Sequence, residues 1–214
     1  MSYIDFEKHE LTDLKGNLFP FNETLQSCIL YFNKVINTKS AINEYEKWLK
    51  NPTKIASKEF VKAVIVDFGE GWRIWGKHFS KLDQWDDINR ILIDSKKTID
   101  QGDVARSIDQ LLKIKGLGPS YASKVARFLS PDAVVLDSIL SEALDLDYQR
   151  DYRKFHLDCS KIATKLKCQP RDIESAIFTW VQICRDGKKK KRWQLKPTDL
   201  KDEALAKHSI AIVR

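Results

Sequence analysis

The sequence contains no apolar run close to the roughly 20 residues that a membrane-spanning helix requires. It begins Met1-Ser2-Tyr3-Ile4-Asp5-Phe6-Glu7, without the basic start and apolar stretch of a secretory signal, so we expect a cytoplasmic protein with no membrane partner. Glycine and proline are scarce, with 8 and 6 copies among 214 residues, and the alternating patterns typical of strands are few. These absences favour an all-α globular protein.

Closely spaced cysteine pairs are also absent. The four cysteines, Cys28, Cys159, Cys168 and Cys184, lack the short paired spacings of zinc sites and iron–sulfur clusters. His156 and Cys159 stand about one helical turn apart, but they supply only two of the four ligands that a zinc site needs. We therefore expect reduced, mostly packed thiols, and no metal, iron–sulfur cluster or other cofactor.

Positive charge is present in excess, and it is concentrated in two places. The formal net charge is +7, from 37 Lys and Arg against 30 Asp and Glu, and residues 187–214 alone hold nine basic and three acidic residues. A second basic stretch, residues 110–131, carries Lys113, Lys115, Lys124 and Arg127 and contains no acidic residue. Like charges crowded in this way repel one another unless an anionic partner compensates them, and nucleic acid is the commonest such partner.

Apolar residues recur at spacings of three and four through most of the chain, which predicts helices. The first spans Leu25 to Ile36, the second begins after a cap at Thr38 or Ser40, and the third follows Ser57 and ends at the glycines of residues 68–71. The aromatic stretch 72–85 receives no assignment. Later helices are predicted after a cap at Asp103, from Pro119 to about Leu129, and over about 139–146, 158–166, 171–185 and 198–207.

Two glycines separated by one apolar residue, Gly116-Leu117-Gly118, lie between two of these helices. Glycine permits positive φ and close approach of the backbone, and the helix that begins at Pro119 offers unpaired amide groups and a partial positive dipole to a phosphate. We therefore predict a DNA-binding hairpin with contact residues Lys115, Gly116, Leu117, Gly118, Ser120, Ser123 and Lys124. The alternative is a helical hairpin that only packs, because glycine turns between helices are common.

The stretch from about Leu111 to Leu144 resembles the helix-hairpin-helix DNA glycosylase superfamily. The signature of that family is a Gly-x-Gly hairpin, a continuation rich in glycine and proline, and a following aspartate; here these elements are Gly116, Gly118, Pro119, Pro131 and Asp137. The likeness covers about a sixth of the chain. It implies a two-lobed glycosylase fold for the single unit 1–214, with a hairpin-bearing lobe over 52–145 and a second lobe made of 1–51 and 146–214, including the basic tail. The flipped base is expected between the lobes, and the protein is expected to be a monomer.

Bifunctional members of that family carry a lysine nucleophile two residues after the second hairpin glycine, where this chain has Ser120. This departure favours a monofunctional enzyme in which water attacks the sugar, leaving an abasic site without lyase activity. Lys124 stands one helical turn later and is expected to contact a phosphate rather than to attack the sugar.

The resemblance assigns the catalytic role to Asp137. A fixed carboxylate stabilises the positive charge that develops on the sugar as the glycosidic bond breaks, and it can also orient or deprotonate water. The alternative is that Asp137 only caps the helix that follows, which is the usual place of an aspartate before a helix.

The enzyme we expect must extrude its target nucleotide, so it needs aromatic groups on which a base can stack. The candidates are Trp72, Trp75 and Trp180. The excised base would be either an oxidised or alkylated base, as in repair, or a hypermodified phage base, as in antiviral defence; the residues do not choose between them. The run 188–192 would either follow the DNA backbone or be a solvated charge run. The alternative function is a non-catalytic helix-hairpin-helix module that binds DNA through its phosphates.

Overall fold

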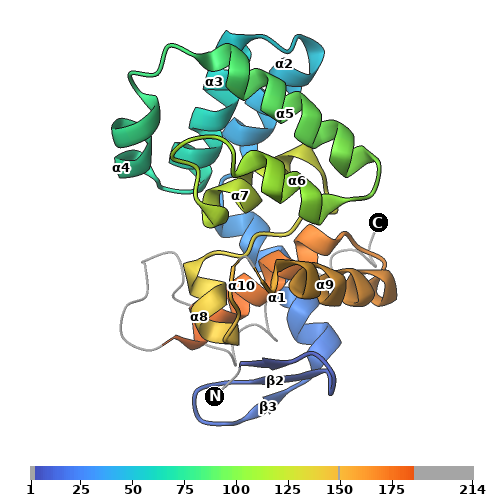
Figure 1. The fold of residues 1–214 in the computed structure, drawn as a ribbon. Coiled ribbons are helices and arrows are strands. Elements are labelled where there is room, and N and C mark those ends of the chain that lie inside the picture. Colours follow the sequence, from blue (N-terminus) through green and yellow to red (C-terminus); the bar gives the residue numbers. More distant parts are fainter. Residues whose placement is uncertain (1–2, 149, 186–214) are drawn as a thin grey trace, which may run out of the picture. The chain divides into compact units, whose positions relative to one another are not determined.

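The computed structural model describes residues 3–148 and 150–185, and over these residues the chain is mostly helical (Figure 1). The strands are β1 Ile4–Asp5, β2 Glu10–Thr12 and β3 Leu18–Phe19. The helices are α1 Phe21–Val35, α2 Lys39–Lys50, α3 Lys54–Lys62, α4 Trp72–Ile74, α5 Trp85–Asp100, α6 Val104–Leu111, α7 Pro119–Leu129, α8 Ser138–Leu144, α9 Tyr152–Leu166 and α10 Pro170–Cys184. Two π-helical stretches, η1 Ala63–Phe68 and η2 Trp75–Phe79, follow α3 and α4. None of the helices in the described ranges combines the length and the apolar character that crossing a membrane requires.

The chain divides into two compact units. The first contains the described residues up to Ile36, the segment Ser138–Asp147 and the described residues from Leu157 onward; the second contains Asn37–Asp137 and Tyr148–His156. The second unit carries the hairpin. Its boundaries differ from the predicted range 52–145, because α2 belongs with the hairpin and α8 belongs to the first unit. The predicted helix near 198–207 and the lysine run 188–192 lie outside the described residues.

The first unit combines a small antiparallel sheet with a helical pair. The strands are ordered β1-β2-β3, and α1 packs against α10. Trp180 of α10 is fully buried, and its indole Nε1 donates to the Tyr3 and Thr12 carbonyl oxygens, both at 3.3 Å. Its ring also meets Phe19 edge-on, at 4.9 Å between centroids. The side chain therefore ties α10 to the sheet.

The second unit is built on helix α5, which packs against α3 and α6. No helix was predicted from the sequence over the range of α5. Its buried positions Trp85, Ile88, Leu92, Ser95 and Ile99 have a regular spacing of three and four, but a serine interrupts the apolar stripe. The positions between these buried residues are mostly polar or charged, which weakens the apolar pattern further.

A polar contact inside this unit corrects the predicted start of the third helix. Helix α3 begins at Lys54, and the Thr53 side chain caps it by accepting from the Ala56 amide at 3.3 Å. Ser57 is fully buried and donates to the Thr53 carbonyl oxygen at 2.8 Å, with its hydroxyl 2.6 Å from Asn89 Oδ1. Ser57 therefore lies inside the first turn rather than before the helix, and α9 likewise begins at Tyr152, earlier than the sequence indicated.

The elements around the hairpin agree with the sequence. The Asp103 side chain caps α6 by accepting from the Arg106 amide at 3.1 Å, and Pro119 occupies the first turn of α7. Helix α7 ends at Leu129, followed by the short irregular segment 133–137, in which every residue is buried. This segment leads to α8, with Asp137 as the residue before it.

Candidate functional site

The tight turn between α6 and α7 depends on Gly116. Its φ is +91°, a left-handed conformation that L side chains rarely adopt. A Cβ at this position would stand 2.6 Å from both Cβ and Cγ of His78, so no larger residue fits there. The turn is thus packed directly onto η2, as Figure 1 shows for the loop between α6 and α7 and the α4 segment beside it.

The backbone conformation and surroundings of the second glycine, Gly118, would accept a larger residue. Gly118 has φ −74° and ψ 169°, which any residue adopts, and a Cβ built on it would meet nothing within 4 Å. It is exposed. Among the described residues, the backbone amides of Gly116, Gly118 and Ser120 find no hydrogen-bond acceptor. The folded chain itself therefore does not require glycine at 118, and the open space beside unpaired amides suits a ligand that approaches the backbone.

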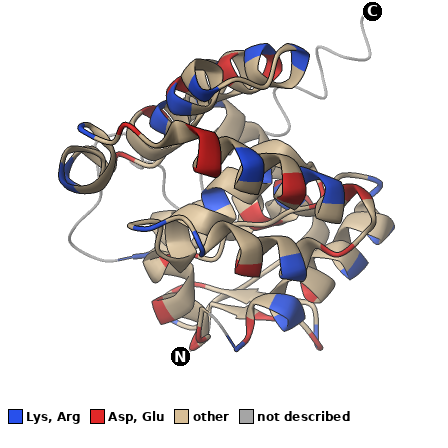
Figure 2. Ribbon diagram, turned by 45° about the horizontal axis from the view of Figure 1, so that its top comes forward, with Lys and Arg blue, Asp and Glu red and all other residues tan. Residues whose placement is uncertain are grey.

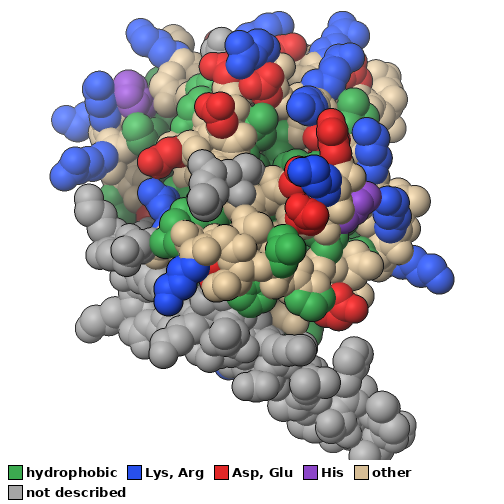
Figure 3. Space-filling view, turned by 90° about the horizontal axis from the view of Figure 1, so that it is seen from below, with side chains coloured by type: hydrophobic (Ala, Val, Ile, Leu, Met, Phe, Trp, Pro, Cys, Tyr) green, Lys and Arg blue, Asp and Glu red, His purple; other side chains and the backbone are tan. Residues whose placement is uncertain are grey.

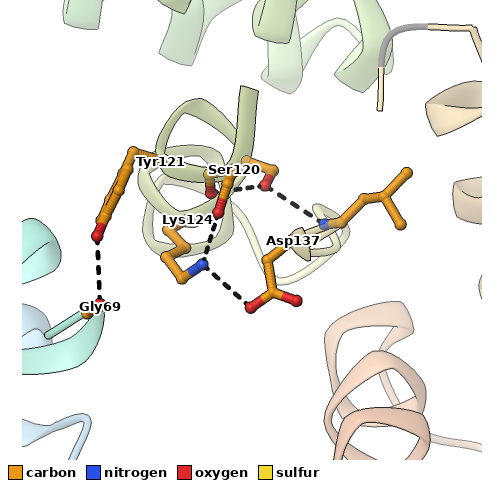
Figure 4. Close-up of polar contacts among 7 residues, drawn as sticks. Gly69, Ser120, Tyr121, Lys124 and Asp137 are labelled. Atoms are coloured by element: carbon orange, nitrogen blue, oxygen red, sulfur yellow. Dashed lines mark hydrogen bonds and ion pairs between the residues drawn. The ribbon is translucent and has the colours of Figure 1, made fainter. Parts of the chain in front are cut away.

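An ion pair joins α7 to the aspartate that precedes α8 (Figure 4). The Lys124 ammonium lies 3.3 Å from Asp137 Oδ2 and donates to the Ser120 hydroxyl at 3.0 Å. The side chains of Lys124 and Asp137 are 11% and 12% exposed. Lys124 also lies over the Tyr121 ring, 5.3 Å from its centroid. The hairpin helix therefore carries one cation inward, against the aspartate.

The segment that delivers Asp137 is held on both sides. The Ser123 hydroxyl accepts from the Leu136 amide at 3.3 Å and donates to the Ser120 carbonyl oxygen at 3.0 Å. From α9, the Tyr152 hydroxyl donates to the Val134 carbonyl oxygen at 3.0 Å, and His156 Nε2 lies 2.9 Å from the Asp132 carbonyl oxygen. These contacts fix the backbone that leads to Asp137.

Tyr152 and His156 thus form a clamp on the backbone of segment 132–134. Burial disfavours protonation of His156 in this clamp. Desolvation lowers the pKa of His156 below its ordinary value, while the hydrogen bond with Asp132 acts in the opposite direction. Its ring stacks on Tyr152, with 6.5 Å between centroids and an interplanar angle of 2°. The neutral imidazole is thus part of the packing that supports Asp137.

Tyr121 connects the ion pair to the turn before α4. Its hydroxyl donates to the Gly69 carbonyl oxygen at 3.4 Å, and a Cβ on Gly71 would collide with that hydroxyl oxygen. Between the two glycines, Glu70 has φ 54°. Burial, followed by the charges of Asp137 and Glu70, raises the pKa of Tyr121, so its phenol stays protonated. Gly69 and Gly71 are needed because Tyr121 presses against them.

The predicted DNA contacts fall into two groups. Lys115 and Gly118 are exposed, and Gly116 and Ser120 are partly exposed. Leu117, Ser123 and Lys124 are buried, at 3%, 1% and 9% exposure. In the free chain the polar atoms of Ser123 and Lys124 bond to Ser120, Leu136 and Asp137 within the protein. This inward orientation could not be read from the sequence, since both residues follow the hairpin at positions that would also suit the surface.

The predicted base-stacking residues also separate. Trp75 is 7% exposed and packs with Phe79 and Trp85, and Trp180 is fully buried. Trp72 is 65% exposed. Of the three tryptophans, only Trp72 has an exposed side chain.

Cys28, Cys159 and Cys184 are buried free thiols, and burial raises the pKa values of Cys28 and Cys159 well above the ordinary value. Over residues 3–148 and 150–185, no three His, Cys, Asp or Glu side chains are grouped so that they could hold a metal ion.

Comparison with known proteins adds no relative: no family model matches the chain, and neither the curated proteins nor the solved structures include a match. The resemblance to the helix-hairpin-helix glycosylases therefore depends on the hairpin and on Asp137.

Proposed function

We propose that this chain is a DNA glycosylase of the helix-hairpin-helix type that hydrolyses the N-glycosidic bond of a damaged or modified base and leaves an abasic site. The proposal includes the two-lobed fold of that superfamily. The single observation that carries it is the position of Asp137. Its nearly buried carboxylate lies 3.3 Å from the ammonium of Lys124, and Lys124 stands one helical turn after Ser120, whose backbone amide has no acceptor among the described residues.

The hairpin supplies the grip on DNA. The amides of Gly116, Gly118 and Ser120 have no acceptor within the described chain, and Lys115 is exposed beside them. A phosphate oxygen at Gly118 would accept from these groups without displacing any protein atom. This contact would set the register of the strand relative to Asp137.

Asp137 then acts on the sugar. As the bond between C1′ and the base nitrogen breaks, the base departs with the electron pair and takes up a proton, and positive charge develops on the sugar. The carboxylate stabilises that charge, water adds to C1′, and Asp137 accepts the proton that the water loses. Ser120 stands where the family's lysine nucleophile would be, so the reaction is hydrolytic.

Lys124 imposes a condition on this step. Two cations, its ammonium and the sugar, cannot share one carboxylate at short range without repulsion. We therefore propose that DNA binding draws Lys124 from Asp137 to a phosphate, which exposes the carboxylate as the sugar arrives. In the free protein the Lys124 ammonium also donates to the Ser120 hydroxyl, and this hydrogen bond can remain while the ammonium moves from Asp137 to the phosphate.

A second candidate function, a non-catalytic DNA-binding module, is favoured by the same ion pair. A carboxylate that is 12% exposed and paired with a lysine is fully accounted for as a structural contact. In that case the hairpin would bind DNA through its backbone, and Asp137 would only hold segment 133–137 against α7.

The decisive experiment incubates the protein with DNA that carries oxidised, alkylated or hypermodified bases and then cleaves abasic sites with alkali. We expect strand breaks with the natural protein, loss of the breaks in Asp137→Asn with binding retained, and no change in Asp109→Asn, a matched control at an exposed position on α6. Tight binding with no product on any substrate would favour the module.

Two further measurements define the reaction. Borohydride should not trap a covalent complex between protein and DNA; a trapped complex would show that an amine, with Lys124 the nearest to Asp137, attacks the sugar. Mass spectrometry of the bases released from damaged, cellular and phage DNA would identify the substrate and so separate repair from antiviral defence.

A further inference from the structure

The segment 71–82, which contains α4 and η2, has a regular two-sided pattern. Gly71, Trp75 and Phe79 are buried, and the positions between them alternate between partly and fully exposed. The rings of Trp75, Phe79 and Trp85 pack together at 5.9 to 6.3 Å between centroids. This aromatic anchor presents the opposite side of the segment, Trp72, Arg73, Gly76, Lys77, Ser80 and Lys81, to solvent.

The outer side of this segment is basic, and the segment contains no acidic residue that could pair with its cations. Residues 71–82 contain Arg73, Lys77, His78 and Lys81 and no acidic residue. None of its Lys or Arg side chains forms an ion pair within the described chain, whereas several exposed cations elsewhere, such as Lys8, Lys47 and Arg90, pair with an acid three residues away. Elsewhere, basic and acidic residues are interspersed on the helices seen in Figure 2 and over the face seen in Figure 3.

The segment that carries this basic side packs against the hairpin. His78 packs against Gly116, next to the exposed Lys115, and Gly71 packs against Tyr121 of the hairpin helix. The hairpin stretch 110–131 is also free of acidic residues. Two segments that contain no acidic residue and are separated in sequence by more than twenty residues thus pack together, and between them they carry the cations Arg73, Lys77, Lys81, Lys113 and Lys115.

The exposed side chain of Trp72 limits the chemical classes of partner that this surface could bind. An indole that is 65% exposed amid cations suits a ligand with flat, unpaired rings and regularly spaced negative charges. Nucleic acid has both, because bases stack on aromatic side chains while phosphates pair with Lys and Arg. An acidic peptide would satisfy the cations but would leave Trp72 without a comparable partner.

We propose that α4 and η2, which pack against the hairpin, form a second DNA-binding surface on which Arg73, Lys77 and Lys81 bind backbone phosphates and Trp72 stacks on an unpaired base. The identity of the nucleic acid as DNA rests on the proposed function. The assignment of these four residues does not depend on Asp137 or on any chemistry at the sugar.

The test measures the affinity of the full chain for a fluorescein-labelled duplex that carries one unpaired base, over a range of salt concentrations. The triple variant Arg73→Gln/Lys77→Gln/Lys81→Gln should weaken binding roughly 10- to 100-fold and reduce the slope of log K against log salt by about 2 to 3, since each duplex phosphate contact contributes about 0.9. The matched control is Lys39→Gln/Lys50→Gln/Lys54→Gln, which removes the same charge from exposed, unpaired positions of α2 and α3 in the same unit.

Trp72 is tested separately. Trp72→Ala should abolish the preference for the unpaired base over a fully paired duplex, with roughly a tenfold loss of affinity for the former. The control Ile55→Ala removes an apolar side chain that is 70% exposed on α3 and should leave the preference unchanged. Both variants alter exposed side chains, so thermal unfolding should remain that of the natural protein.

The outcomes separate this inference from the proposed function. Equal losses in the two triple variants, or an unchanged affinity in Arg73→Gln/Lys77→Gln/Lys81→Gln, would overturn the second surface while base release could still be observed. A selective loss of binding together with no base release from any DNA would support the surface and overturn the glycosylase. Failure of the natural protein to bind any DNA would overturn both.

Discussion

The two hairpin glycines should respond in opposite ways to alanine, because the fold requires one of them and not the other. At Gly116, φ is +91° and a Cβ would stand 2.6 Å from His78. The left-handed conformation alone costs an L residue about 1 to 2 kcal/mol, and the collision with His78 adds to it, so Gly116→Ala should lower the free energy of unfolding by about 2 kcal/mol or more. Its DNA binding would fall together with its stability.

Gly118→Ala should separate the two properties. Its φ of −74° and ψ of 169° suit a residue that precedes proline, and the new methyl meets nothing within 4 Å. Reduced freedom of the unfolded chain should then raise stability by about 0.4 to 1 kcal/mol. A phosphate held by the neighbouring amides would meet that methyl, and loss of one hydrogen bond to a charged group, about 1.5 to 3 kcal/mol, corresponds to roughly a 10- to 100-fold weaker complex.

The measurements are urea unfolding and fluorescence anisotropy with labelled duplex, both carried out on the natural protein and the two variants. If Gly118→Ala bound DNA as tightly as the natural protein, the phosphate would not lie against the hairpin backbone. If Gly118→Ala were as unstable as Gly116→Ala, the open space beside Gly118 would not exist in solution. Either result would refute the reasoning.

Three further predictions follow from the clamp and the ion pair. Lys124→Met should lower the free energy of unfolding by about 2 to 4 kcal/mol, because it removes the lysine partner of a nearly buried carboxylate; the loss should be much smaller when Asp137→Leu is present, and a double-mutant cycle by urea unfolding would measure the coupling. Because the pKa of His156 is lowered in the folded state, the unfolded chain binds its proton more tightly, so stability should fall as pH decreases below about 6.5; His156→Gln should reduce this dependence between about pH 7.5 and about pH 5.5, and equal slopes would contradict it. Tyr152→Phe should cost about 1 kcal/mol and increase amide exchange at residues 134–136, and unchanged exchange would argue against the clamp.

The sequence was sufficient where local chemistry decides the structure. Asp103 caps α6, Pro119 opens α7 and Gly116 adopts positive φ, and each of these follows from the conformational preferences of a single residue type. The predominance of helix was likewise predictable from the spacing of apolar residues. The three-stranded sheet was not, because its strands of two or three residues are too short for an alternating pattern and are defined by their pairing.

The candidate site could be predicted only in part. Asp137 and the hairpin glycines were found from their order along the chain, whereas the inward orientation of Lys124 and Ser123 depends on how α7 packs against segment 133–137. The part that Tyr152 and His156 of α9 take in holding that segment could not be predicted, because nothing local marks a residue whose partner lies about twenty positions earlier. Such roles belong to tertiary packing rather than to sequence pattern.

The segments that close the two units determine the order in which the chain can complete them during synthesis. The hairpin unit has its last contacts at Tyr152 and His156, so its clamp can form as soon as those residues have left the ribosome. The other unit is completed later, because the indole of Trp180, near the end of α10, donates hydrogen bonds to the carbonyl oxygens of Tyr3 and Thr12 in the amino-terminal sheet region. The amino-terminal residues thus remain without their partner until almost the whole described chain has been made, and a chain stopped shortly after His156 would contain a complete hairpin unit with an unfolded leader.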